Sequence, residues 1–271
     1  MGKKTIIMLI ILLVIVVAAI TTFLVLYLNG TISFKDGFHL GKKIDTDTII
    51  YEEKYKMDEI NSIDVKRKAG NIIFENSNDD NIKVEIYGEK KSDAEVSLVN
   101  NELKIEYKAE GKGGWIFGLG RAAGDVIIYI PASYAHNIKI INDAGEVKIA
   151  NAENADIDVD CDAGNVKIDR IKNARIKCDA GDIEIKNLLN RCNIKVDAGN
   201  LKIDHAQLNE NSSIKADSGN VRIKELNNIY IDTKVDMGNC NISNNNKESE
   251  VTLKIDCNMG NVTVKDNSKE F

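Results

Sequence analysis

The sequence is poor in the residues and motifs on which most catalysis depends. It has three histidines, at positions 39, 136 and 205, and they lie in separate segments. It has no Gly-x-Ser-x-Gly phrase, and no Walker or Rossmann phrase follows a strand–helix pattern. Gly118–Gly124 is glycine-rich, but it lacks the Gly-Lys-Ser/Thr ending of a phosphate-binding loop and leads into a predicted strand. We therefore expect a protein that is not an enzyme and that has no catalytic residues, no metal site and no cofactor.

The chain has fewer basic than acidic residues. The chain has 36 basic and 42 acidic residues, so its formal net charge is −6. Lys3 and Lys4 precede an apolar run, and without them 34 basic residues stand against 42 acidic ones, which leaves about −8 for the remainder. This balance disfavours a nucleic-acid partner, and it argues against electrostatic attachment to an anionic lipid surface.

The longest apolar run covers residues 5–28, and its polar members are Thr5, Thr21, Thr22 and Tyr27. It exceeds the roughly 20 residues that a helix needs to cross a bilayer core. The alternative is a cleaved signal peptide, whose apolar region is about 7–15 residues long and ends at a small-residue cleavage site. Ala18 and Ala19 lie in the middle of the run, and no such site follows Leu28. The pattern predicts an uncleaved transmembrane signal anchor.

The orientation of this anchor depends on its flanking charges. Lys3 and Lys4 adjoin one end of the run, while Lys35, Lys42 and Lys43 lie further from the other end. The count of positive residues is ambiguous, but adjacency favours a short cytoplasmic tail at residues 1–4. We expect a single-pass protein of the cell membrane with its C-terminal domain outside the cytoplasm.

Beyond the anchor, three regions are predicted. Residues 29–56 are polar and lack a period, which indicates a flexible stalk. Residues 57–265 form a β-repeat domain, and residues 266–271 a tail. Short runs of alternating polarity, bounded by Gly, Asn and Asp, predict strands in the first part of the domain. They are Ser62–Lys66, Asn71–Glu75, Asn81–Tyr87, Ala94–Leu98, Glu102–Tyr107 and Asp125–Ile130.

One short phrase recurs seven times within residues 138–265. It reads Asp-Ala-Gly-Glu-Val-Lys-Ile at 143–149 and Asp-Ala-Gly-Asn-Val-Lys-Ile at 162–168. The copies are marked by Gly145, Gly164, Gly181, Gly199, Gly219, Gly238 and Gly260. Aliphatic residues recur two and four positions after each glycine and five before it, with the exceptions Cys240 and Thr233. Residues 68–72, Lys-Ala-Gly-Asn-Ile, look like a degenerate earlier copy.

This recurrence predicts an all-β fold, a parallel β-solenoid built as a β-helix-like stack of ~19-residue coils. Alternation with a period of two, with β-branched residues inside, defines half-buried strands, and each coil holds two of them. We expect matching side chains, such as Val166 and Ile183, to stack in continuous internal columns. A looser apolar column seven residues after glycine predicts a filled third corner. It changes to Asn245 and Asn267 in the last two copies, where we expect the stack to fray.

The aspartate of each phrase has two interpretations. Six of them, at 143, 162, 179, 197, 217 and 236, would form a ladder along one edge, which could hold Ca²⁺. The alternative is a tight turn in which the aspartate accepts a hydrogen bond from the backbone two residues on, and glycine takes a positive φ. The seventh copy has Asn258 instead, and each copy has a single glycine. Both facts favour the turn.

Cysteine is scarce, and its positions are informative. The five cysteines form no Cys-x-x-Cys pair, and no histidine lies at zinc-ligand spacing. They are Cys161, Cys178, Cys192, Cys240 and Cys257. All five replace small apolar residues on inward-facing positions, so we expect buried thiols that act as small hydrophobic side chains. Cys161 and Cys178 would meet in neighbouring coils, which leaves a disulfide between them open.

The only tryptophan lies in a glycine-rich segment between residues 111 and 124, as part of Trp115-Ile116-Phe117. These three side chains are the candidate partner-contact residues, because a loop of this kind can present aromatic rings to a protein, a glycan or a membrane. The alternative is that the rings fold back and cover the open end of the β stack.

The repeats resemble those of the bacterial putative-adhesin family of β-repeat proteins, a group filed largely as a domain of unknown function. The resemblance rests on residues 63–65 and 69–72, on Ile130-Pro131 and on the serial Asp-Ala-Gly-Asn-Val-Lys-Ile copies, and it covers about residues 57–265. It implies a membrane-anchored envelope protein, and in some members an association with envelope stress. The family offers no catalytic residues to carry over.

These observations predict a non-enzymatic, membrane-anchored β-solenoid with a structural, adhesive or protein-interaction role in the bacterial cell envelope. Its partners would be an envelope protein, a cell-wall polymer or a second copy of itself. An alternative is a regulatory envelope-stress partner of a membrane complex. A carbohydrate-active β-helix enzyme is disfavoured, because its acidic residues would gather on one outward face, whereas here they are spread along the repeats.

Overall fold

The computed structural model describes residues 32–33, 39–40, 48–88, 90–108 and 124–266. The chain forms two compact units, one of residues 46–110 with 123–271 and one of residues 1–45 with 111–122. In the latter unit, β1 (Ile32–Ser33) pairs antiparallel with β2 (His39–Leu40). The predicted tail at 1–4 and the predicted anchor at 5–28 lie outside the described residues. Among the residues that are described, no helix is both long and apolar enough to span a bilayer.

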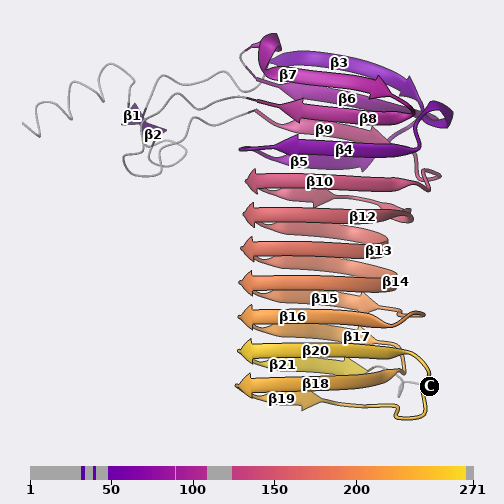
Figure 1. The fold of residues 1–271 in the computed structure, drawn as a ribbon, viewed down its shortest axis with the longest axis vertical. Helices are drawn as coiled ribbons and strands as arrows, with labels where there is room; N and C mark the ends of the chain where they lie inside the picture. The colour runs from indigo at the N-terminus through magenta and orange to yellow at the C-terminus, as the bar shows by residue number, and fades with distance from the viewer. Residues whose placement is uncertain (1–31, 34–38, 41–47, 89, 109–123, 267–271) are drawn as a thin grey trace, which may run out of the picture. The chain divides into compact units, whose positions relative to one another are not determined.

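The larger unit is all-β, and its strands lie one above another in a stack (Figure 1). Its first part contains the short 3-10 helices η1 (Met57–Glu59) and η2 (Lys91–Asp93). The strands of this part are β3 (Ile49–Lys56), β4 (Ser62–Arg67), β5 (Ile72–Asn76), β6 (Asn81–Tyr87), β7 (Ala94–Val99), β8 (Glu102–Tyr107) and β9 (Val126–Ile130). Six of them match the predicted strands within a residue at each end, which confirms those predictions.

The repeats continue the same hydrogen-bonded sheet. Their strands are β10 (Asn137–Ala144), β11 (Val147–Ile149), β12 (Ala152–Ala163), β13 (Val166–Ala180), β14 (Ile183–Ala198), β15 (Leu201–Ala206), β16 (Ser212–Ser218), β17 (Val221–Leu226), β18 (Tyr230–Met237), β19 (Cys240–Ile242), β20 (Thr252–Met259) and β21 (Val262–Asp266). Each coil has one strand after its glycine and one before the next glycine. In two coils these two segments are joined into one long strand that continues around the corner, and these long strands are β13 and β14.

The strands of successive coils pair parallel and in register, as predicted. Val166 lies opposite Ile183, and both side chains are buried. The third corner is filled by the predicted column, since Ala152, Ile171 and Leu188 are buried and in register. Alternation explains this arrangement, because every second side chain points inward and is aliphatic, while its neighbours are Lys, Asp, Glu or Asn. Burial of one such aliphatic side chain stabilises the fold by about 1.5–3 kcal/mol.

A column of glycines runs along one corner of the stack. Gly199 has a φ of +149°, and a Cβ built on it would lie 2.0 Å from the carbonyl oxygen of Gly181. A side chain has no room there, so the close approach of successive backbones requires glycine. Gly70 belongs to the same column, since a Cβ on Gly145 would lie 2.3 Å from the Gly70 oxygen. Residues 68–72 are therefore the first copy, which confirms the prediction.

The first part of the domain closes the stack with antiparallel strands. β4 and β5 pair parallel with β8 and β9, while β6, β7 and β3 are added antiparallel. The prediction of a stalk over 29–56 is therefore wrong for β3. Tyr51 and Tyr55 of this strand pack against the core, and its backbone pairs with β6. An edge strand with a partly buried face thus lies where composition suggested a mobile chain.

The last two copies are exchanged in the stack. β20 lies between β16 and β18, and β21 lies between β17 and β19. The seventh copy therefore packs directly on the fifth, and the sixth copy ends the stack. This arrangement places Ile255 on Ile214 and leaves Thr233, the polar member of that column, at the end. Our expectation that both final copies fray is wrong for the seventh, whose Val262 and Val264 are buried.

Candidate functional site

The candidate partner-contact residues Trp115, Ile116 and Phe117 lie outside the described residues, so their roles remain predictions. The described surface offers other candidates. They are a polar cavity beside β3, a buried polar column near the glycine corner, the row of aspartates, a ladder of asparagines and the open last coil.

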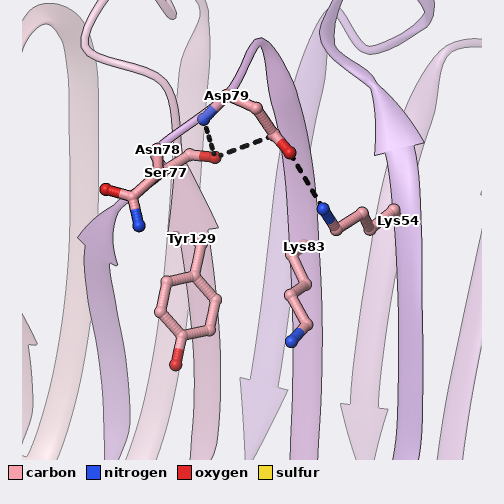
Figure 2. A pocket seen from close by; sticks show the side chains of 6 residues that line it. All are labelled: Lys54, Ser77, Asn78, Asp79, Lys83 and Tyr129. Atoms are coloured by element: carbon pink, nitrogen blue, oxygen red, sulfur yellow. Dashed lines mark hydrogen bonds and ion pairs between the residues drawn. The ribbon is translucent and has the colours of Figure 1, made fainter.

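The polar cavity lies where β3, the β5–β6 turn and β9 meet. Its volume is about 290 Å³, and Figure 2 shows its lining side chains. They are Lys54, Ser77, Asn78, Asp79, Lys83 and Tyr129. This volume is near the lower limit for a small-molecule pocket.

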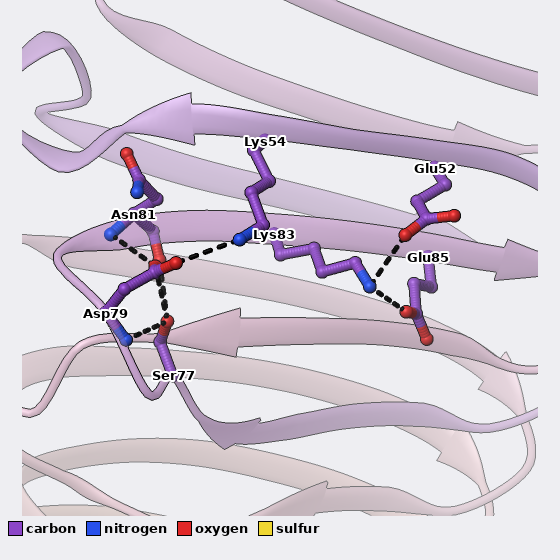
Figure 3. A network of polar contacts seen from close by, with 7 residues as sticks. All are labelled: Glu52, Lys54, Ser77, Asp79, Asn81, Lys83 and Glu85. Atoms are coloured by element: carbon purple, nitrogen blue, oxygen red, sulfur yellow. Dashed lines mark hydrogen bonds and ion pairs between the residues drawn. The ribbon is translucent and has the colours of Figure 1, made fainter.

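Asp79 organises one half of this cavity. Its carboxylate accepts hydrogen bonds from Lys54 Nζ at 2.8 Å, the Asn81 backbone N–H at 3.0 Å and Ser77 Oγ at 3.2 Å (Figure 3). The bond from Lys54, followed by that from Asn81, lowers the pKa of Asp79 to about 2. This carboxylate is therefore ionised at neutral pH and cannot serve as a general acid.

Lys83 organises the other half. Its Nζ lies 2.7 Å from Glu52 and 2.5 Å from Glu85, which also accepts hydrogen bonds from Tyr87 and Tyr129. These carboxylates raise the pKa of Lys83. Burial acts to raise the pKa of Glu85, but the bonds from Lys83 and Tyr87 outweigh it and lower the pKa. The charged groups of the cavity neutralise one another, so it could contact a polar ligand but offers no unpaired acid, base or nucleophile.

The buried polar column starts at Arg67, which is 2% exposed. Its guanidinium lies 4.7 Å from the centroid of the Tyr107 ring, and its Nε donates to the Ala69 carbonyl at 2.6 Å. Burial lowers its pKa to about 10. The fully buried Asn142 lies beside it in the next coil and donates to the Gly70 carbonyl at 3.3 Å. This polar end of the core was not predicted, because both residues fall three positions before a glycine, where later copies are apolar.

The row of aspartates faces outward and is paired with lysines. Asp179 lies 2.9 Å from Lys177, and Asp197 lies 2.6 Å from Lys195. The Lys195 ammonium lowers the pKa of Asp197. Among the described residues, no group of three or more His, Cys, Asp or Glu side chains is placed to hold a metal ion.

The hydrogen bond that we predicted for these turns is wrong, although the positive φ is confirmed. The N–H of Gly199, two residues after Asp197, donates to the Ser218 carbonyl of the next coil at 2.9 Å. This N–H belongs to the ladder between coils and is not available to the aspartate. The turn is therefore set by the stacked backbone, and the aspartate keeps its charge on the surface.

The residues that follow the glycines form a ladder from Asn165 through Asn239, which was not predicted from the sequence. Asn200 Oδ1 accepts from the Asn220 backbone N–H at 3.1 Å and from its Nδ2 at 3.0 Å. Asn220 Oδ1 likewise accepts from the backbone N–H and from Nδ2 of Asn261. Asn261 Oδ1 accepts from the backbone N–H of Asn239. The recurring Asn was the available signal, since stacked amides of this kind form ladders.

We expect Asn200→Ala to lower the free energy of unfolding by about 1 kcal/mol, because at a solvent-exposed rung it removes the acceptor of two hydrogen bonds from Asn220 and the Nδ2 donor to Asp182. Urea unfolding followed by circular dichroism would measure it. Asn239→Ala is the matched control, since no further coil follows this rung, and it should change stability by less than about 0.5 kcal/mol. Equal effects of the two substitutions would contradict a ladder that acts between coils.

Four of the five cysteines are buried, as predicted, and Cys240 is exposed, which corrects that prediction. The reason is the exchange of copies, because Cys240 lies in the coil that ends the stack. Cys161 and Cys178 are in register in neighbouring coils, and both are free thiols. Burial raises the pKa of the Cys257 thiol and raises that of Cys192 to about 12, so these two groups are un-ionised small side chains at neutral pH.

The last coil is the least covered part of the repeats. It is formed by β18 and β19, and each pairs on one side only among the described strands. Val235 and Ile242 are half-buried, although their counterparts Val196 and Ile185 in the middle of the stack are fully buried. Met237 is 62% exposed. Half-buried apolar side chains thus lie beside strand edges that pair with one strand only, and the Asn245 side chain covers the edge of β18 at Ile231.

Comparison with known proteins gives one family and several solved structures that are similar to the chain. The model of the family described as Toastrack DUF4097 matches residues 60–267. No curated protein matches the chain. The sequence identity to each of the following structures is low, and so is the TM-score.

The crystal structure of a putative cell adhesion protein from Clostridium sporogenes ATCC 15579 is 13% identical, with a TM-score of 0.38 over 81% of this chain and 100% of that chain. A putative adhesin from Bacteroides fragilis NCTC 9343 is 16% identical, with a TM-score of 0.42 over 82% and 98%. A putative adhesin from Parabacteroides merdae ATCC 43184 is 14% identical, with a TM-score of 0.36 over 80% and 95%.

Proposed function

The chain belongs to the Toastrack DUF4097 family, and from this premise we propose that it is a non-enzymatic protein of the bacterial cell envelope. Residues 5–28 anchor it in the membrane as a single helix. The β stack lies outside the cytoplasm and has a structural, adhesive or protein-interaction role there. The family match confirms the resemblance inferred from the repeat phrases, while the anchor and the location are parts of the proposal.

The filled interior of the stack is the observation that carries the proposal. Aliphatic side chains occupy the inner columns from Ile63 through Val264, and those of the central coils are buried almost completely. Within the described coils these side chains fill the interior, which favours a role for the surface of the stack. The polar cavity on that surface has its charges paired with one another, which suits contact with a partner better than acid–base chemistry.

The outward faces support the same role. Five residues after glycine, acidic residues and lysines alternate between neighbouring coils, so Lys224 lies 2.6 Å from Asp204, and Lys186 lies 2.8 Å from Asp169. Exposed ion pairs of this kind contribute little to stability, at most about 1 kcal/mol each. They keep two long sheet faces hydrated and available to an envelope protein or a cell-wall polymer.

Epitope tags at the two ends of the full-length chain test the location. On intact cells stripped of their wall, an antibody should label a tag after Phe271 and should label a tag before Met1 only after permeabilisation. Removal of residues 5–28 should release the chain from the membrane fraction. Labelling of the N-terminal tag alone on intact cells would place the stack in the cytoplasm and overturn the proposal.

A saccharide-degradation assay tests the non-enzymatic part. The purified full-length protein should release no sugar from cell-wall polymer. Turnover that Asp79→Asn or Lys83→Ala abolished would show that the polar cavity is an active site, and the proposal would then be wrong.

A further inference from the structure

The last coil presents two open strand edges at once. β18 pairs with β20 and β19 pairs with β21, and neither strand has a second partner among the described strands. Their outer edges carry backbone N–H and C=O groups that can extend the sheet, except at Ile231, whose N–H and C=O bond the Asn245 side chain at 2.8 Å each. The edge of β18 from Thr233 to Met237 is therefore the part open to another strand, and such edges are templates for association unless they are protected. Each face of the coil offers one edge, so the end of the stack is a two-sided docking surface.

The side chains at this end favour docking over solvation. Cys240 and Met237 are exposed, and Val235 and Ile242 are covered on one side only. Proteins commonly protect such edges with very short strands, charged side chains, bulges, proline or a covering loop. Here β19 has 3 residues, β18 carries Lys234 on its outward face, and Asn245 covers Ile231, but the inner side of the coil has no such protection. The inward positions of β18 and β19 hold Thr233, Val235, Cys240 and Ile242, none of which is charged.

Charge decides which partner fits. Lys234 and Asp236 lie on either side of Val235 along β18 and point outward, with exposed side-chain fractions of 71% and 48%, and within one copy they pair with each other at 3.2 Å. Consider a second copy related by a two-fold axis through Val235, with its β18 antiparallel to the first. Residues equidistant from the axis then lie opposite each other, so the Lys234 of each copy faces the Asp236 of the other. The edge is complementary to itself.

We propose that the last coil is the site of head-to-head dimerisation, in which β18 pairs with β18 of a second copy and β19 with β19. A second copy supplies both edges at once, in one closed two-fold contact, whereas a single added strand would satisfy only one face of the coil. The exchange of the last two copies makes this contact possible, because it places the coil that holds Thr233 and Cys240 at the end of the stack. The inference rests on the end of the stack and is independent of the membrane location.

A charge exchange on the full-length protein in non-ionic detergent tests the contact, with sedimentation equilibrium as the measurement. We expect a concentration-dependent dimer for the wild type. K234E and D236K should each raise the dimer dissociation constant about tenfold or more, because each sets like charges opposite each other. The double variant K234E/D236K should return it to within about threefold of the wild type, since the pairs are restored in reverse.

The matched control is K215E. Lys215 and Asp217 form the same pair in an inner coil, at 3.2 Å, and lie away from the end. This variant should leave the dissociation constant unchanged. A monomeric wild type, an assembly that grows beyond the dimer, or equal effects of K215E and K234E would each overturn the proposal.

Cysteine crosslinking gives a second measurement. Cys240 is the exposed thiol among the described cysteines, and it lies on the edge strand β19 near the proposed axis. A short bismaleimide should link the wild type into dimers and should leave C240S monomeric. Absence of linked dimers in the wild type would overturn the head-to-head arrangement. The epitope-tag result does not depend on either outcome, so failure of the dimer and failure of the proposed location are distinguishable.

Discussion

Gly199→Ala is expected to lower the free energy of unfolding by about 3 kcal/mol or more. The added Cβ would lie 2.0 Å from the Gly181 carbonyl oxygen, and the φ of +149° is one that L-residues rarely adopt. Neither neighbour can move away easily, because the backbone of each coil is hydrogen-bonded to the coils on both sides. Relief of the contact would require the coils to separate at this corner, which would weaken the ladder between them.

Urea unfolding of the full-length protein, followed by far-UV circular dichroism, measures this effect. Ser218→Ala is the control, because Ser218 precedes the glycine of the next coil and is exposed, and other copies have alanine there. It should change stability by less than about 0.5 kcal/mol. If Gly199→Ala were equally mild, the glycine corner would have room for a side chain and would not set the spacing of the coils.

The strands and the internal columns could be predicted because their cause is local. A period of two with aliphatic residues inside defines a half-buried strand, and a constant distance from each glycine defines which residues stack. Val166 and Ile183 could therefore be assigned to one column from spacing alone. The degenerate copy at Gly70 was visible for the same reason.

The exchange of the last two copies could not be predicted, because its cause is not local. All copies carry similar aliphatic columns, so each can pack on any other, and the order depends on small differences such as Thr233 against Ile255. The exposure of Cys240 follows from that order and was missed with it. β3 was missed because only its tyrosines pack, while its charged residues match the composition of a stalk.

Some features of the candidate site could likewise be predicted from the sequence, and others could not. The outward row of aspartates could be located from the phrase, but the partners of those aspartates depend on which lysines the register brings alongside. The self-complementary edge at Val235 depends on the order of the copies, so it is visible only once the last coil is known. The repeat pattern in the sequence shows which side chains stack in one column. An interface at the end of the stack depends on which coil has no neighbour, and the pattern does not show that.

Ile185→Ala is expected to lower the free energy of unfolding by about 3 kcal/mol. Ile185 is fully buried between Ile168 and Ile203, four residues after its glycine, so its loss leaves a cavity with a coil on both sides. Ile242 holds the same position in the last coil, where Val264 covers it on one side only. Ile242→Ala should therefore cost about 1 kcal/mol, since solvent already reaches this residue.

The comparison needs a protein concentration well below that at which dimers form, because docking of a second copy would cover Ile242. Urea unfolding under these conditions should separate the two variants by about 2 kcal/mol. At higher concentration the cost of Ile242→Ala should rise, because the variant would also lose contacts in the dimer. Equal costs for Ile185→Ala and Ile242→Ala at every concentration would show that the last coil is covered in the monomer, and the end of the stack would then offer no edge to a second copy.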